Sequence, residues 1–94
     1  MRIEWSAAAS EDRDTIFDYI EADNPSAAIG GDDRIREQVG RLGSFPELGR
    51  PGRIDGTREL VIVHTPYIAA YRIVDDTVRI LRILHGAQLW PTEF

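Results

Sequence analysis

The sequence predicts an α+β fold in which a short N-terminal strand and an antiparallel helix hairpin precede a three-stranded antiparallel meander, with the strands forming one sheet. Apolar residues recur at helical spacing through the first half of the chain. A segment rich in glycine and proline follows, and after it come three apolar segments separated by short turns. With 94 residues, 43% of them hydrophobic, the chain suits one domain over residues 1–94.

The first half contains the strand and both helices. Residues 2–5, RIEW, suit a short strand, and Ser6 follows as the N-cap of a helix that runs to about Asp23. The motif NPS at residues 24–26 ends this helix and begins a second one, because proline is favourable in the first helical turn. The second helix is predicted to run to about Ser44. Because the intervening turn is short, the two helices should be antiparallel.

The second half contains the sheet. Residues 45–56, FPELGRPGRIDG, hold too many glycines and prolines for a regular element and predict a loop. Strands are predicted at 58–63, 67–74 and 77–84, where HTP and DD supply the two turns. Short connections make the three strands an antiparallel meander, after which a tail completes the chain.

These strands are apolar on both faces. Residues 60–63, 67–71 and 80–84 are apolar at odd and even positions alike, whereas a sheet covered on one face alternates apolar and polar residues. The helix hairpin can cover only one face. We therefore expect the other face to be covered by the tail with Leu89 and Trp90, by a second chain, or by a partner protein.

Composition excludes several classes of site. The chain has no cysteine, which excludes disulfides, thiolate zinc sites and thiol nucleophiles. Asp32 and Asp33 are adjacent on a helix and point about 100° apart, so they do not predict a metal site. No metal or cofactor is expected. No apolar stretch is long enough for a signal peptide or a membrane span, which indicates a soluble, cytoplasmic protein with no membrane association.

Charge is unevenly distributed along the chain. Residues 1–47 carry 5 arginines and 11 carboxylates, a net charge of -6, and residues 48–94 carry 6 arginines and 5 carboxylates, a net charge of +1. The first half should therefore repel nucleic acid. All the cations are arginines, which make bidentate contacts that lysine cannot reproduce.

Six segments, taken in order, resemble a family of bacterial toxins. They are the opening strand that ends in Trp5, the helix pattern IFDYIEADNPSAA, the loop FPELGRPGR, and the segments GTREL, PYIAAYRI and RILRILHGAQLWP. Together, from Trp5 to Pro91, they are similar to the ParE/RelE superfamily of type II toxin–antitoxin modules. The resemblance implies a toxin neutralised in a hetero-oligomer by a cognate ParD-like antitoxin, whose C-terminal segment wraps around it. Such a partner would also explain the doubly apolar strands.

The superfamily divides by target. RelE-like members are ribosome-dependent mRNA nucleases, and ParE-like members poison DNA gyrase. Here the lysines common in the RelE-like active loop are missing, no tyrosine follows the final strand, and an acidic protein is poorly suited to binding ribosomal phosphates. The ParE-like branch and DNA gyrase inhibition are therefore expected. The alternatives are a ribosome-dependent mRNA endonuclease and a non-toxic protein-interaction module.

A metal-free nuclease would need a general acid or base and cations around the phosphate. The candidates for these roles are His85, Arg58, Arg82 and Tyr71. Each also has a structural interpretation: His85 would bond a neighbouring backbone group, and the two arginines would pair with a carboxylate of this chain. The carboxylates considered are Glu59, Asp75 and Asp76.

Binding residues are predicted for both partners. Candidates for contact with the target are Arg50, Arg53, Arg58 and Trp90. Arg50 and Arg53 are expected in a surface loop, where they would contact a partner's carboxylates or this chain's own acidic helices. Candidates for contact with the antitoxin are Ile16, Tyr19, Ile20, Ile35, Val39, Leu60, Ile62, Tyr67 and Tyr71.

Overall fold

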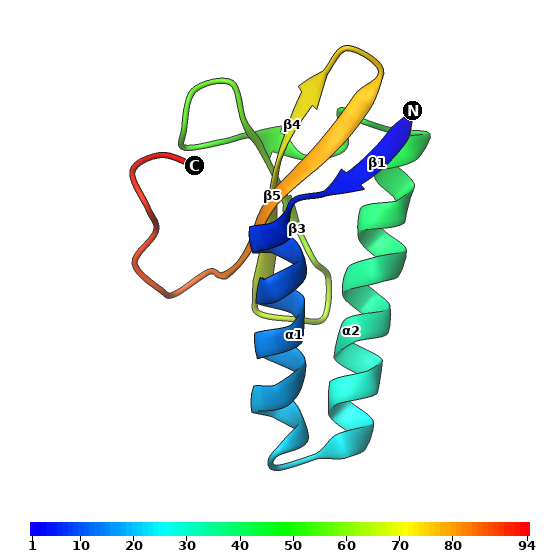
Figure 1. The fold of residues 1–94 in the computed structure, drawn as a ribbon, viewed down its shortest axis with the longest axis vertical. Helices are drawn as coiled ribbons and strands as arrows, with labels where there is room; N and C mark the ends of the chain where they lie inside the picture. The colour runs from blue at the N-terminus through cyan, green and yellow to red at the C-terminus, as the bar shows by residue number, and fades with distance from the viewer.

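The computed structural model describes residues 1–94 and confirms the α+β prediction (Figure 1). The elements in order are β1 (Arg2–Trp5), α1 (Ala7–Glu21), α2 (Pro25–Gly40), a 3-10 turn (Arg41–Gly43), β2 (Arg50–Pro51), β3 (Arg58–Val61), β4 (Tyr67–Val74) and β5 (Thr77–His85). The strand order is β1-β5-β4-β3-β2. β1 is parallel to β5, and the other neighbouring strands are antiparallel. In Figure 1 the turn between the helices lies at the opposite end of the molecule from the β4–β5 turn.

Several element boundaries differ from the sequence prediction. The strand predicted at 58–63 ends at Val61, where the chain leaves regular pairing before the turn. The segment 45–56 is not entirely loop, because Arg50 and Pro51 pair with Glu59 and Arg58 and add a fifth strand. Proline is tolerated there because β2 is the edge strand, where its missing N–H leaves no gap in the sheet. The second helix ends at Gly40, and the chain continues to Gly43 as a 3-10 turn rather than as α-helix to Ser44.

Both helices begin where the sequence predicts, and a side-chain cap fixes each start. The hydroxyl of Ser6 accepts a hydrogen bond from the N–H of Ala9 at 3.0 Å, and the side-chain oxygen of Asn24 accepts one from the N–H of Ala27 at 3.1 Å. Pro25 occupies the first turn of α2. These bonds satisfy N–H groups that have no partner within a helix, so they fix where each helix starts.

The start of α1 also closes the free edge of β5. β1 pairs with β5 only as far as Ile80. Beyond that point the hydroxyl of Ser6 donates to the carbonyl of Leu81 at 3.0 Å, and the carboxylate of Asp12 accepts from the N–H of Ile83 at 2.9 Å. Polar side chains thus take the place of a longer strand, and this edge is not available for pairing.

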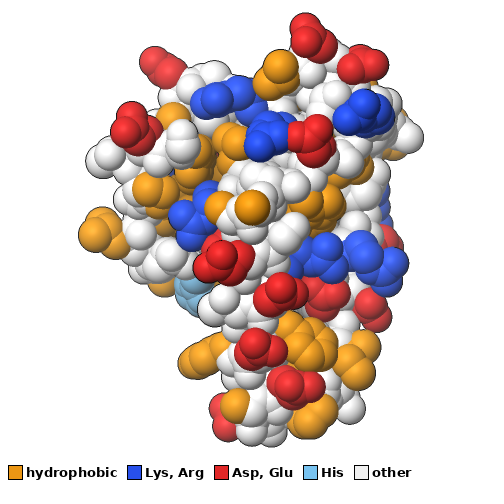
Figure 2. Space-filling view, viewed as in Figure 1, with side chains coloured by type: hydrophobic (Ala, Val, Ile, Leu, Met, Phe, Trp, Pro, Cys, Tyr) orange, Lys and Arg blue, Asp and Glu red, His pale blue; other side chains and the backbone are white.

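The main core lies between the helices and one face of the sheet. Its buried members are Ala9, Ile35, Val39, Leu42, Leu60, Ile62, Ala69, Tyr71, Val78, Ile80 and Ile83. The core cluster contains no acidic residue. Figure 2 shows several acidic side chains over the part of this view occupied by α1, and others near the end that carries the β4–β5 turn. None of the helices is long and apolar enough to cross a membrane.

Apolar residues on the other face are also buried. Ile68 and Ala70 flank Ala69 in β4 and therefore point away from the core, and Leu84 is the cross-strand neighbour of Ile68. All three are at most 8% exposed. The strands are thus apolar on both faces because both faces are partly covered within the chain.

The tail and the loop after β2 meet on this second face. The guanidinium of Arg53 lies 3.5 Å from the centre of the Trp90 ring, and the Trp90 indole N–H donates to the carbonyl of His85 at 3.3 Å. Leu89 is 96% exposed, so its predicted role as a cover is wrong. Of the three covers expected, the tail contributes through Trp90.

Candidate functional site

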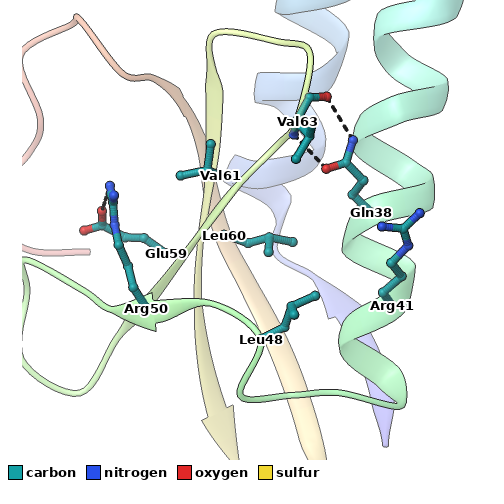
Figure 3. A pocket seen from close by; sticks show the side chains of 8 residues that line it. All are labelled: Gln38, Arg41, Leu48, Arg50, Glu59, Leu60, Val61 and Val63. Atoms are coloured by element: carbon teal, nitrogen blue, oxygen red, sulfur yellow. Dashed lines mark hydrogen bonds and ion pairs between the residues drawn. The ribbon is translucent and has the colours of Figure 1, made fainter.

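An open cavity of about 360 Å³ runs beside the outer edge of β3 (Figure 3). We call it the β3 groove. Helix α2 supplies one wall, and the chain from Leu48 into β2 supplies the other. The residues that line it are Gln38, Arg41, Leu48, Arg50, Glu59, Leu60, Val61 and Val63.

The floor of the β3 groove is an open sheet edge, where backbone groups have no neighbouring strand. The N–H of Ile62 donates to the carbonyl of Tyr67 in β4 at 3.0 Å. Hydrogen-bonding directions alternate along an antiparallel strand, so the backbone groups of Val61 and Val63 point away from β4. β2 pairs only with Arg58 and Glu59 and does not reach Val61.

A side chain occupies the end of this edge. The amide of Gln38 accepts from the N–H of Val63 at 2.7 Å and donates to its carbonyl at 3.0 Å, as the dashed lines in Figure 3 show. It therefore bonds Val63 as the backbone of a neighbouring strand would. No residue does this for Val61, whose backbone groups face the β3 groove.

The surfaces around this edge are apolar and cationic. Leu48 is 53% exposed, Val61 46% and Val63 55%. Arg41 and Arg50 flank them, and the one lining carboxylate, Glu59, is buried and paired. Exposed apolar residues beside free backbone groups are typical of sites where an extended peptide adds to a sheet.

A buried tyrosine fixes the wall that carries Leu48. The Tyr71 hydroxyl accepts from the N–H of Gly49 at 2.9 Å and donates to the carbonyl of Pro46 at 2.7 Å. Arg58 donates to the carbonyl of Gly49 at 2.8 Å. Burial raises the pKa of Tyr71, and the bond from Gly49 offsets part of that rise. The hydroxyl therefore remains a neutral donor and acceptor that holds the loop on the sheet.

Arg50 and Arg53 share one buried carboxylate. Glu59, whose side chain is 3% exposed, accepts from the Arg50 guanidinium at 3.1 Å, from the Arg53 N–H at 2.8 Å and from the Arg53 guanidinium at 3.1 Å. Burial alone would raise the pKa of Glu59, but these bonds outweigh it and lower the pKa. The prediction that Arg50 and Arg53 contact this chain's acidic helices is corrected: they pair with Glu59, which the β2–β3 register places opposite Arg50. Their contact with a partner stays a prediction.

The residues predicted for nuclease chemistry do not converge. Arg58 and Tyr71 meet at Gly49. His85 pairs with Tyr67, four residues along β4 from Tyr71, which corresponds to roughly 13 Å along a strand. Its ring meets Tyr67 edge-on at 5.5 Å, and its Nδ1 accepts from the N–H of Ala87 at 3.0 Å. The structural interpretation of His85 therefore matches its surroundings.

Arg82 pairs with a carboxylate other than the three predicted. Its guanidinium donates twice to the carboxylate of Asp12 in α1, at 2.7 and 3.0 Å, and not to Glu59, Asp75 or Asp76. The reason is that α1 docks against the free edge of β5, which brings Asp12 to this level of the strand. No group of three or more His, Asp or Glu side chains is placed to hold a metal ion.

The residues predicted to contact the antitoxin divide by burial. Ile35, Val39, Ile62 and Tyr71 are at most 1% exposed and belong to the core, so their side chains are not available to a partner in this conformation. Ile16, Ile20 and Tyr67 are half-buried. Leu60 is 8% exposed and belongs to the core, but it also lines the β3 groove. Tyr19 is 76% exposed.

Sequence reasoning missed five of the residues that line the groove, one of which is Arg41. The other four are Gln38, Leu48, Val61 and Val63. Val61 and Val63 carried a usable signal, because they have the opposite parity to the core residues Leu60 and Ile62. Nothing in the sequence distinguishes Gln38 from an ordinary exposed helical glutamine.

Comparisons with known proteins agree with this fold. Residues 3–90 match the family model described as the ParE toxin of the type II toxin–antitoxin system parDE. The chain is 48% identical over 90 residues to Y4kP of Sinorhizobium fredii, named as a candidate toxin, and the match covers 96% of this chain and 93% of that protein. It is 36% identical over 88 residues to toxin RelE2 of Caulobacter vibrioides, with 94% and 98% covered. A chain from the chromosomal ParDE system of P. aeruginosa superimposes with a TM-score of 0.85 at 31% identity, covering 90% of this chain and 95% of that one.

Proposed function

Because the chain belongs to the ParE toxin family of type II toxin–antitoxin systems, we propose that it is a cytoplasmic toxin that inhibits DNA gyrase and is neutralised by a ParD-like antitoxin. The antitoxin is the partner chain that covers the exposed apolar surfaces of the toxin. The observation that favours gyrase is that every candidate nuclease side chain already interacts with another group of this chain. Inhibition by binding needs no proton transfer and is compatible with that arrangement.

The argument against RNA cleavage is geometric. A metal-free nuclease must place a proton donor or acceptor and cations around one phosphate. In this chain Tyr71 is fully buried, Arg82 is held by Asp12, and His85 lies far along the sheet from Arg58. The acidic first half adds repulsion toward a polyanion such as ribosomal RNA.

Producing the toxin without its antitoxin tests the target directly. We expect chromosomal breaks and arrested replication while early translation continues, because a gyrase inhibitor of this kind traps cleaved DNA. A ribosome-dependent nuclease would instead halt translation and leave codon-spaced cuts in mRNA. DNA breaks, replication, protein synthesis and mRNA integrity should be followed together over the first minutes. Rapid mRNA cleavage with intact chromosomes would refute the gyrase proposal.

The variant His85→Gln sharpens this test. Removal of a general acid or base costs a nuclease roughly 10² to 10⁴ in rate. A gyrase inhibitor should lose little, since the glutamine oxygen can still accept the bond that Nδ1 accepts from Ala87. We expect this variant to stay toxic. A folded, antitoxin-binding but harmless His85→Gln protein would favour the nuclease.

A further inference from the structure

We propose that the β3 groove binds an extended, acidic segment of the antitoxin as an added strand, and that the Gln38 amide occupies part of that site until the segment displaces it. This inference rests on the proposed function, because the antitoxin is the natural source of the segment. It adds the chemistry of the segment, the strand that receives it, and a side chain of the toxin that competes with it.

The backbone of β3 defines how the segment lies. The N–H and C=O groups of Val61 and Val63 point into the groove, in line with the place that β2 occupies farther along the same edge. A segment in extended conformation can therefore continue the line of β2. Its main chain would bond Val61 directly, and it would bond Val63 once the Gln38 side chain has moved away.

Gln38 is suited to displacement. Its two bonds to Val63 are solvent-exposed, and its amide supplies one donor and one acceptor in the same arrangement as a backbone peptide unit. An incoming strand would replace both bonds with equivalent ones. The amide thus covers the edge in the free toxin without closing it, which limits edge-to-edge aggregation.

The side chains around the edge define the composition of the segment. Leu48, Val61 and Val63 are each about half exposed and offer an apolar surface to alternate residues of an added strand. Arg41 and Arg50 stand on opposite walls, with side chains 57% and 55% exposed. The groove contains no free carboxylate, since Glu59 is buried between Arg50 and Arg53. A segment of alternating apolar residues and carboxylates is complementary to this surface.

Arg41 is the side chain best placed to attract a carboxylate of the segment. In the free toxin Arg41 contacts Glu37 one helical turn away at 3.3 Å, an exposed pair of small energetic value. A carboxylate on the bound segment can therefore compete for Arg41 at little cost. Arg36 lies in α2, five residues before Arg41, is similarly exposed, is paired with Asp33, and does not line the groove. It supplies a matched control.

The test titrates the folded toxin with two six-residue peptides, one alternating glutamate with valine and the other alternating lysine with valine. Backbone amide signals are followed by NMR. We expect the acidic peptide to shift the signals of Val61 and Val63 and to release the Gln38 side-chain amide. The basic peptide should bind at least several-fold more weakly. Equal binding of both peptides, or shifts confined to surfaces outside the groove, would overturn the proposal.

Two pairs of variants separate this role from a purely structural one. Gln38→Ala should bind the acidic peptide about 3- to 10-fold more tightly, because two weak competing bonds are gone. Gln88→Ala, which removes a glutamine that also bonds a backbone N–H, should leave affinity unchanged. Arg41→Glu should weaken binding by a similar factor, and Arg36→Glu should change it less than twofold.

Opposite results in these variants contradict the proposal. Unchanged or weaker peptide binding by a folded Gln38→Ala protein would show that the amide is only a structural bond. Equal effects of Arg41→Glu and Arg36→Glu would show that only net charge matters. The assay contains neither gyrase nor antitoxin, so failure of the groove and failure of the gyrase proposal appear in separate experiments.

Discussion

Replacing Gly49 with alanine should destabilise the protein by about 2–3 kcal/mol, because the new methyl group has no room. A Cβ at this position would lie 2.6 Å from both Cε1 and the hydroxyl oxygen of Tyr71 and 2.9 Å from the carbonyl oxygen of Glu59. Tyr71 is fully buried, and the Glu59 oxygen is part of the sheet backbone, so neither can yield easily. The melting temperature should fall by about 10–20 °C.

Gly40 provides the matched control for this substitution. No atom lies within 4 Å of a Cβ built at Gly40, and its backbone angles, φ -57° and ψ -29°, are helical. Gly40→Ala should therefore raise stability by up to about 1 kcal/mol. Thermal and urea unfolding of both variants measures the difference. If Gly49→Ala proved as stable as Gly40→Ala, the close packing of the 45–56 segment against Tyr71 would be wrong.

Replacing Glu59 with glutamine should cost about 1–2 kcal/mol at pH 7. Glutamine keeps one acceptor oxygen but leaves Arg50 and Arg53 without their carboxylate. Loss of one partner from a fully buried ion pair costs about 3–5 kcal/mol. Here the arginine side chains are 55% and 45% exposed, so water screens them and the expected cost is smaller. Glu37→Gln, which alters an exposed pair, should change stability by less than about 0.5 kcal/mol.

The lowered pKa of Glu59 predicts that the stability of the protein depends on pH. The pKa of Glu59 is lower in the folded protein than its ordinary value of about 4.3. Its stabilising contribution is therefore fully present above that ordinary value and is lost as the pH falls through the folded-state pKa. The wild type should lose stability on acidification faster than Glu59→Gln, and the two curves should converge at low pH. Urea unfolding at pH 7, 5, 4 and 3 checks this; parallel curves would contradict it.

Local signals in the sequence predicted the elements well. Ser6 caps the first helix as expected, the NPS motif begins the second, and the HTP and DD turns separate the strands. These features depend on neighbouring residues, and their chemistry can be read directly. The two-residue strand β2 could not be predicted, because Arg50 and Pro51 are extended only through their pairing with Glu59 and Arg58.

The candidate site depended more on tertiary contacts. Arg50 and Arg53 were identified as important, but their partner Glu59 follows from a register that the sequence does not specify. Asp12 meets Arg82 only because α1 docks on the open edge of β5. Gln38 acquires its role from Val63, 25 residues later in the chain. Position in the fold, rather than residue type, makes these side chains part of a site.

The most direct test of the gyrase proposal uses purified components without ribosomes. Toxin is incubated with gyrase, ATP and supercoiled plasmid, and the enzyme is then denatured and digested to reveal broken DNA. We expect linear DNA to accumulate with toxin concentration and to disappear when the product of the adjacent reading frame, the expected antitoxin, is added first. A parallel translation reaction receives the same toxin concentrations. Intact plasmid at concentrations that stop translation would contradict the gyrase proposal.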